Sequence, residues 1–148
     1  GVPFESGLLF HGADLVRDGQ LVDRFSSWHE GEQLTLRLWW SIERIQLKDY
    51  SMGIYVTDGL HTVIEEHTAP LTVSYYPEEP TPPPSTSWWQ PGRYYVEERA
   101  FTLPANLLSG LYTVKMSVYH WEDGVLLDAP QVDENGLLPI ASFGVRAW

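Results

Sequence analysis

Paired glutamates are the first residues in this sequence that could do chemistry. Glu65 and Glu66, and likewise Glu97 and Glu98, lie in runs of strand-forming residues. A glycosidase needs two carboxylates that face each other across a cleft, roughly 5–10 Å apart, whereas neighbours along a strand point to opposite faces. No serine lies in a nucleophile signature either. The sequence therefore predicts that the protein is not an enzyme and needs no cofactor.

A second group of possible ligands is acidic and falls between residues 122 and 134. Oxygen ligands gathered in a loop suit calcium, but their spacing does not match the twelve-residue helix-loop-helix pattern. We favour the alternative, acidic turns on an acidic protein, so no metal site is predicted. The weak calcium candidates are Asp123, Asp128, Asp133 and Glu134, with Glu122 beside them. The absence of cysteine excludes disulfides and thiolate metal sites.

Aromatic residues are the most informative group, because seven tryptophans and eight tyrosines exceed what one core requires. Some of them fall on strand faces that point away from the predicted core. Exposed aromatic rings stack on the apolar faces of sugars. The alternative is that these rings pack against the front hairpin or a neighbouring domain, since large aromatics are commonly half buried. The candidate ligand-binding residues are Trp39, Trp88, Tyr119 and Trp121.

The elements that must position these residues are strands. In residues 34–42, Leu36, Leu38 and Trp40 share one face, and Trp39 lies on the other. No long stretch has helical spacing, whereas period-two alternation and turn signals recur about every ten residues. The sequence predicts an all-β, immunoglobulin-like antiparallel β-sandwich of seven to nine strands. The other expected strands are 7–16, 20–25, 50–57, 60–68, 93–103, 110–121 and 137–145, with a short candidate at 125–127.

One local motif supports this fold class. Leu107, Gly110 and Tyr112 have the spacing Leu-x-x-Gly-x-Tyr and precede alternating apolar residues. This pattern resembles the tyrosine corner of immunoglobulin-like sandwiches, in which the tyrosine hydroxyl bonds to backbone a few residues upstream. The alternative is a strand that merely begins with tyrosine.

Charge restricts the possible partners. The chain has 148 residues, with 20 acidic against 9 basic side chains and a net charge of −11. Such a surface repels the phosphates of nucleic acid and of anionic lipid, so we expect no nucleic-acid partner. No apolar run approaches the roughly 20 residues of a membrane helix. Because the sequence starts at Gly1 rather than methionine, we expect it to be part of a longer chain, which would carry any membrane anchor.

Residues 77–92 hold six of the eleven prolines and could be a linker between two domains. Neither half of the chain could easily close a two-sheet core alone. We therefore expect residues 1–148 to form a single domain, in which 77–92 is an ordered crossover loop between the sheets. Trp88 and Trp89 should point in opposite directions, one plugging the end of the sandwich and the other facing solvent.

The back half of the chain resembles a bacterial β-sandwich module. That module lies at the extracytoplasmic C-terminus of membrane glycosyltransferase-like proteins of the dolichyl-phosphate-mannose type. His120 departs from its pattern, as do Leu108 and Ser109, which leaves in doubt any ligand that used the usual carboxylate. The matching residues are Ser87, Trp89, Pro91, Gly92, Leu103, Pro104, Ala105, Asn106, Leu107, Gly110, Tyr112 and Tyr119.

The resemblance covers about residues 30–145, and it implies no catalytic residue. It implies a non-catalytic module in the cell envelope, attached to a membrane only through the longer parent chain. We expect its exposed aromatic residues to recognise a glycan or a protein partner. The competing interpretation is a structural spacer with no ligand.

Overall fold

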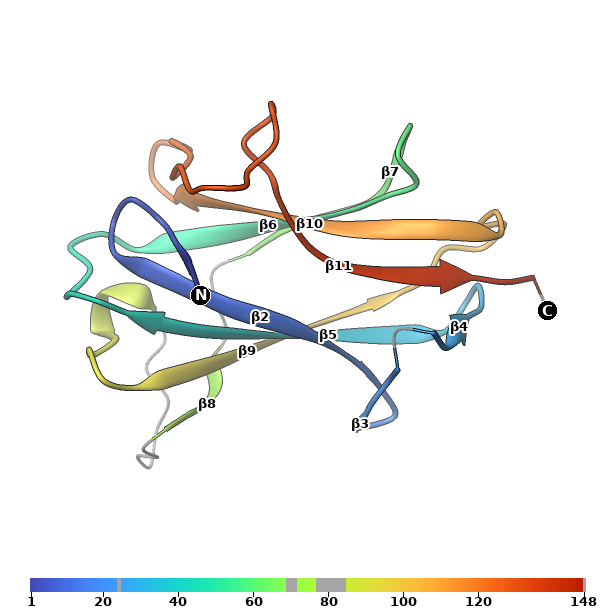
Figure 1. The fold of residues 1–148 in the computed structure, drawn as a ribbon, viewed down its shortest axis with the longest axis horizontal. Coiled ribbons are helices and arrows are strands. Elements are labelled where there is room, and N and C mark those ends of the chain that lie inside the picture. The colour runs from blue at the N-terminus through green and yellow to red at the C-terminus, as the bar shows by residue number, and fades with distance from the viewer. Residues whose placement is uncertain (24, 69–71, 77–84, 148) are drawn as a thin grey trace.

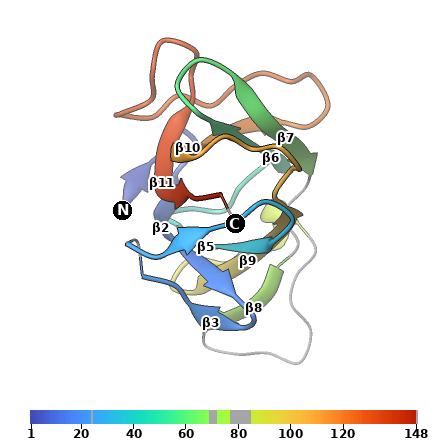
Figure 2. The ribbon, with the colours of Figure 1, turned by 90° about the vertical axis from the view of Figure 1, so that its right-hand side faces the viewer.

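The computed structural model describes residues 1–23, 25–68, 72–76 and 85–147, the segment 72–76 by its backbone alone. Two sheets pack face to face, one above the other in Figures 1 and 2. Sheet A contains β1 (Val2–Pro3), β2 (Leu8–Arg17), β3 (Gln20–Leu21), β5 (Gln33–Ile42), β8 (Thr72–Tyr76) and β9 (Tyr94–Thr102). Sheet B contains β4 (Ser27–Trp28), β6 (Tyr50–Thr57), β7 (Thr62–Thr68), β10 (Gly110–His120) and β11 (Leu138–Val145). The prediction of an all-β sandwich is confirmed.

The strand order is that of an immunoglobulin domain. The path β2-β5-β9-β8 in sheet A corresponds to strands A, B, E and D, and β11-β10-β6-β7 in sheet B to G, F, C and C′. All pairs are antiparallel except the two-residue pairing of β4 with β11, which is parallel. Each sheet takes strands from both sides of residues 77–92.

Several local expectations need correction. In the described part of 20–25, which leaves out residue 24, the structure has only a two-residue strand, and 125–127 contribute one bridge, from Leu126 to Tyr119. β1, β4 and β8 were not predicted, and neither was η1 (Thr86–Trp88), a single turn of 3-10 helix. No helix in the described ranges is long and apolar enough to cross a membrane.

The stretch 77–92 does not change sheets, contrary to the expectation of a crossover. It connects β8 to β9, which are neighbours in sheet A, so the change of sheet comes earlier, between β7 and β8. Residues 77–84 of this stretch lie outside the described residues. In the described remainder, Trp89 is fully buried and stacks on Tyr95, with 4.5 Å between ring centroids, whereas Trp88 is 67% exposed. The expectation that one indole is buried and the other faces solvent is confirmed.

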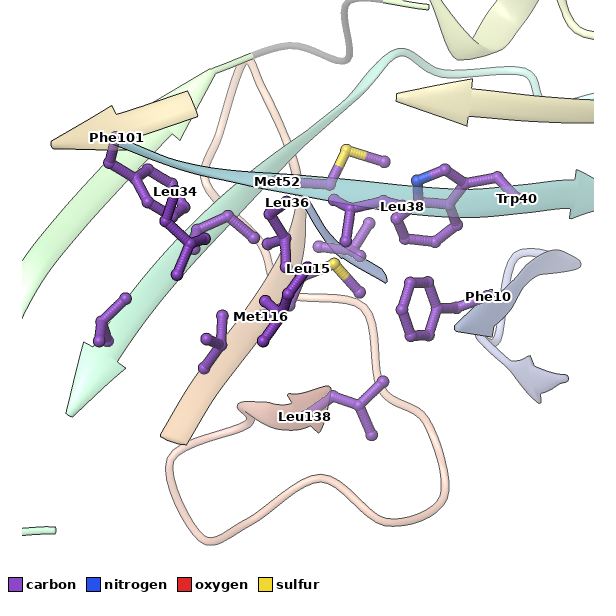
Figure 3. Packing of buried hydrophobic residues seen from close by; sticks show 14 of the residues in the cluster. Phe10, Leu15, Leu34, Leu36, Leu38, Trp40, Met52, Phe101, Met116 and Leu138 are labelled. Carbon is purple, nitrogen blue, oxygen red and sulfur yellow. The ribbon is translucent and has the colours of Figure 1, made fainter. Parts of the chain in front are cut away.

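The core lies between the sheets, where the alternating residues predicted to face inward meet (Figure 3). Leu36, Leu38 and Trp40 of β5 are completely buried, opposite Met52 of β6 and Met116 of β10. In the same cluster, Phe10 of β2 packs edge-on against the Trp40 indole, with ring centroids 5.0 Å apart. The period-two pattern of the sequence therefore marks the faces that form the interior.

The interior also holds an ion pair. Glu97 and Arg99, both on β9, are 1% and 4% exposed. Arg99 donates to Glu97 Oε2 from Nε (3.0 Å) and Nη2 (2.8 Å), and the Trp40 indole donates to Glu97 Oε1 (3.2 Å). Burial raises the pKa of the Glu97 carboxyl, against the opposing effects of the Arg99 charge and of these hydrogen bonds. Arg99 also donates to the backbone oxygens of Met52 and Thr68 in sheet B, so this pair ties the two sheets together.

The tyrosine corner is present at the start of β10. The Tyr112 hydroxyl donates to the backbone carbonyl of Leu108 at 2.7 Å, and its ring stacks on Phe143 of β11. β10 occupies the place of strand F, where this motif occurs in immunoglobulin-like domains. The prediction from the Leu-x-x-Gly-x-Tyr spacing is confirmed.

Candidate functional site

The four predicted aromatic residues lie on three different surfaces. On β5, Trp39 lies between two inward-facing residues and projects from the outer face of sheet A. Tyr119 of β10 projects from the outer face of sheet B. Trp88 belongs to η1, and Trp121 comes directly after β10. A single platform made of all four residues is therefore not formed.

Trp39 is largely covered by its surroundings. The residue is 36% exposed, and its indole N–H donates to Asp14 Oδ2 at 2.8 Å on the neighbouring strand. An indole whose edge is already held by a carboxylate has less to offer a ligand. Trp39 is therefore better described as a ring that packs on its own sheet than as a binding platform.

Tyr119 belongs to a cluster of polar rings on the outer face of sheet B. Its ring meets the His67 imidazole edge-on, with centroids 5.6 Å apart, and His67 meets Tyr55 in the same way at 5.5 Å. Gly53 faces His67 across the β6–β7 pair, and a Cβ there would lie 2.6 Å from Ser117 Oγ and 2.8 Å from His67 Cε1. The glycine thus leaves space for the imidazole, and these rings mainly contact one another.

Among the tryptophans that the structure describes, Trp88 and Trp121 are the most exposed, at 67% and 60%, and their segments lie at the same end of the sandwich. At the left of Figure 1, η1, the loop between β5 and β6, and the turn after β10 come together. Asp49 of that loop joins the other two segments. Its Oδ1 accepts the backbone N–H of Ser87 at 3.0 Å, and its backbone carbonyl accepts the N–H of Trp121 at 3.4 Å.

Thr86 fixes the position of η1 on this loop. It is completely buried, its hydroxyl donates to the Lys48 carbonyl at 3.2 Å, and the same oxygen accepts the backbone N–H of Tyr50 at 3.0 Å. A threonine that bonds twice to the neighbouring loop holds the short helix in one place, and Trp88 with it.

The segments next to the two indoles also carry polar groups. His120 Nδ1 lies 3.2 Å from Asp123 Oδ2, and the imidazole packs edge-on against the Tyr50 ring. Burial raises the pKa of Asp49, but hydrogen bonds from Ser87 and Ser85 and the charge of His120 outweigh it and hold this pKa below its usual value. The pKa of Asp123 is lowered by the backbone N–H of Val125 and by the His120 side chain. Both carboxylates are therefore ionised at neutral pH. We call this region the Asp49 surface; it consists of Asp49, Trp88, His120, Trp121, Glu122 and Asp123.

The weak calcium candidates are not gathered into a site. The Asp123 carboxylate pairs with His120, and the Asp128 carboxylate accepts the backbone N–H of Ala129. Asp133 accepts Lys115 Nζ at 2.8 Å and the backbone N–H groups of the turn that follows it. No group of three or more possible ligands that could hold a metal ion occurs within the ranges that the structure describes, which include Glu134.

Sequence reasoning missed the polar half of the Asp49 surface. Asp49 lies at the end of a loop that carries no motif, and no other histidine lies near His120 in the sequence. Asp49 and Ser87, which bond to each other, are 38 positions apart in the chain. Only the packing of η1 on the β5–β6 loop brings them together. The nearest available signal was Glu122-Asp123-Gly124, which marked a turn beside Trp121.

Comparison with known proteins shows the fold and leaves the family open. No protein-family model matches this sequence, and no curated protein matches it. Among solved structures, the C-terminal domain of Wzt is similar, with a TM-score of 0.53 and 15% sequence identity over 99% of this chain and 77% of that one. At this identity the likeness concerns the β-sandwich alone. The resemblance to the dolichyl-phosphate-mannose-type module is thus supported as far as a β-sandwich domain, without a family match.

Proposed function

We propose that this protein is a non-catalytic recognition domain that binds glycan at the Asp49 surface. The observation that carries the proposal is the pair of exposed indoles, Trp88 and Trp121, in two segments that both bond to Asp49. Exposed indoles offer flat apolar faces to the C–H side of a sugar ring, and the neighbouring carboxylates accept hydrogen bonds from its hydroxyls.

The placement of Glu97 and Glu98 on β9 supports a binding role. Glu97 points into the core and is held by Arg99, while Glu98 points outward and pairs with Arg37 at 3.1 Å. Neighbouring carboxylates on opposite faces of one strand cannot act on one bond. The adjacent glutamates therefore supply no hydrolytic pair.

The same proposal extends to the cellular setting. The resemblance in the back half of the chain supports an extracytoplasmic module of a membrane glycosyltransferase-like protein, in the cell envelope. The net charge of −11 supports a partner other than nucleic acid. In this setting a glycan, or a protein partner that carries one, is the ligand, and any membrane attachment comes through the parent chain.

Titration of the domain with a broad glycan panel, followed by tryptophan fluorescence, tests the proposal. We expect at least one glycan to bind and to perturb the emission. Trp88→Ala and Trp121→Ala should each weaken binding by roughly fivefold or more, since stacking on one aromatic ring is worth about 1 kcal/mol or more. Trp39→Ala is the matched control, because that indole lies on the outer face of sheet A. Its binding should equal that of the wild type, once a thermal melt has shown that each variant is folded.

Two outcomes contradict the proposal. Binding that survives both Trp88→Ala and Trp121→Ala would place the ligand elsewhere. If no glycan in the panel binds, the recognition role fails, and the domain is a structural spacer.

A further inference from the structure

We infer that the Asp49 surface selects its ligand by charge: it accepts neutral and amino-bearing sugars and rejects sugars that carry carboxylate or phosphate. The inference rests on the glycan-binding function proposed above. It adds the chemical class of the ligand, which the two indoles alone do not specify.

The charged groups of the surface set this preference. Asp49, Glu122 and Asp123 contribute three carboxylates to the segments that carry or contact the two indoles, and the first and last have lowered pKa values. Two nearby basic groups offset them in part. His120 is engaged with Asp123 at 3.2 Å, and the same carboxylate senses the charge of Lys48. The local balance is therefore negative, on a protein that is negative overall.

Hydrogen-bond chemistry points the same way as charge. Ionised carboxylates only accept hydrogen bonds, so a well-matched ligand must offer donors. Sugar hydroxyls and ammonium groups are donors, and vicinal hydroxyls match the two oxygens of a carboxylate. The charged group of a uronate or a phosphate presents hydrogen-bond acceptors to carboxylates, which are acceptors as well. These groups stay unpaired, and their like charges repel one another.

Glu122 is the group that tests the idea most cleanly. It lies between Trp121 and Asp123 in the turn after β10, and it is exposed, so its substitution should disturb neither the core nor the His120–Asp123 pair. Glu66 is a matched control, because it is an exposed glutamate on β7, away from η1 and the β10 turn. Removing either residue changes the net charge of the protein by the same amount, so a difference between the variants reports local charge.

The experiment compares trisaccharides of matched length: cellotriose and chitotriose as neutral probes, the de-N-acetylated chitosan trimer as the amino probe, and trigalacturonate as the anionic probe. Calorimetric titrations are run at about 20 mM and about 500 mM salt, which spans weak and strong screening. We expect a neutral probe to bind equally at both salt concentrations, the amino probe to bind more weakly at high salt, and trigalacturonate not to bind at low salt.

Charge removal should then change the ranking. In Glu122→Gln, binding of the amino probe should weaken by roughly three- to fivefold at low salt, the size expected for one exposed charge pair, and by more than binding of the neutral probes. Glu66→Gln should behave as the wild type does. If trigalacturonate binds the wild type at low salt as tightly as the neutral probes do, the charge selection is wrong while the glycan-binding function stands. If none of the four probes binds and the wider panel also fails, both proposals are overturned.

Discussion

The guanidinium group of Arg99 starts on β9 in sheet A and donates a hydrogen bond to the backbone carbonyl of Met52 in sheet B, at 2.9 Å. The same group holds the Glu97 carboxylate, which has no other charged partner among the described residues. In Arg99→Met this carboxylate loses its partner within the core. We expect a loss of about 3–5 kcal/mol in the free energy of unfolding, measured by urea denaturation followed by tryptophan fluorescence.

The double variant Glu97→Leu/Arg99→Met is the control for that prediction. It removes both charges, so it should be markedly more stable than Arg99→Met alone. Equal losses in the two variants would mean that the lost sheet-to-sheet hydrogen bonds, rather than the unpaired charge, dominate the cost.

The neighbours Trp88 and Trp89 should differ sharply in their effect on stability. Trp89 is completely buried against Tyr95, so Trp89→Ala leaves a large cavity and should cost about 3–5 kcal/mol. Trp88→Ala removes an exposed ring and should change stability by less than about 0.5 kcal/mol. Thermal melts of the two variants, side by side, check this prediction, and similar losses in both would contradict the described orientation of the indoles.

The tyrosine corner makes a smaller, defined contribution. Tyr112→Phe keeps the stack on Phe143 but removes the hydroxyl that donates to Leu108, so we expect a loss of about 1 kcal/mol. Tyr94→Phe is a suitable control, because that ring is half exposed on the outer face of sheet A. Chemical denaturation of both variants gives the comparison, and an unchanged midpoint for Tyr112→Phe would show that the hydroxyl contributes nothing.

Gly53 should tolerate no side chain. A methyl group there would lie 2.6 Å from Ser117 Oγ and 2.8 Å from His67 Cε1, so Gly53→Ala should displace the imidazole and cost about 1–3 kcal/mol. Adding His67→Ala to Gly53→Ala should recover part of the loss, because the imidazole would no longer compete for the space. Double-mutant-cycle denaturation measures this coupling; purely additive losses would rule out the contact.

Asp133 provides a pH-dependent test. The hydrogen bond from Lys115 lowers the pKa of Asp133 below its ordinary value of 3.8, against a smaller effect of burial. A folded-state pKa that is depressed adds stability above the unfolded-state pKa, and this stability is lost as the pH falls through the folded-state value. Asp133→Asn should therefore reduce stability at neutral pH by about 1 kcal/mol or less, given solvent screening at a half-exposed pair.

The difference between wild type and Asp133→Asn should shrink as the pH falls below about 4. Denaturation curves of both proteins between neutral pH and about pH 3 provide the check. A gap of constant size across this range would show that Asp133 acts through hydrogen-bond geometry rather than through charge.

The sequence was sufficient for the long strands. β6 has the predicted limits, Tyr50–Thr57, because its inward residues alternate strictly and an Asp-Gly turn follows it. β4 and β1 escaped notice because two residues carry no periodicity, and the pairing of β4 depends on the distant β11. No strand was expected between residues 68 and 77, so β8 was missed and the change of sheet was assigned to 77–92 instead of the connection between β7 and β8.

The candidate site was only half predictable. Period-two alternation identified Trp39 and Tyr119 as outward-facing, but it could not show that β5 and β10 belong to different sheets and present these rings on opposite sides. The segments that carry Trp88 and Trp121 both bond to the β5–β6 loop, through Thr86 and Ser87 on one side and the Trp121 backbone on the other. Contacts of this kind join segments far apart in the chain, and no local pattern announces them.

β7 is an edge strand of sheet B, and its charges affect how molecules associate in concentrated solution. It carries Glu65 and Glu66 at consecutive positions, and both are exposed. A bare strand edge invites another molecule to add its own strand, and like charges along that edge oppose such addition. We therefore expect the charges on β7 to hinder edge-to-edge pairing between molecules and the growth of fibres from it.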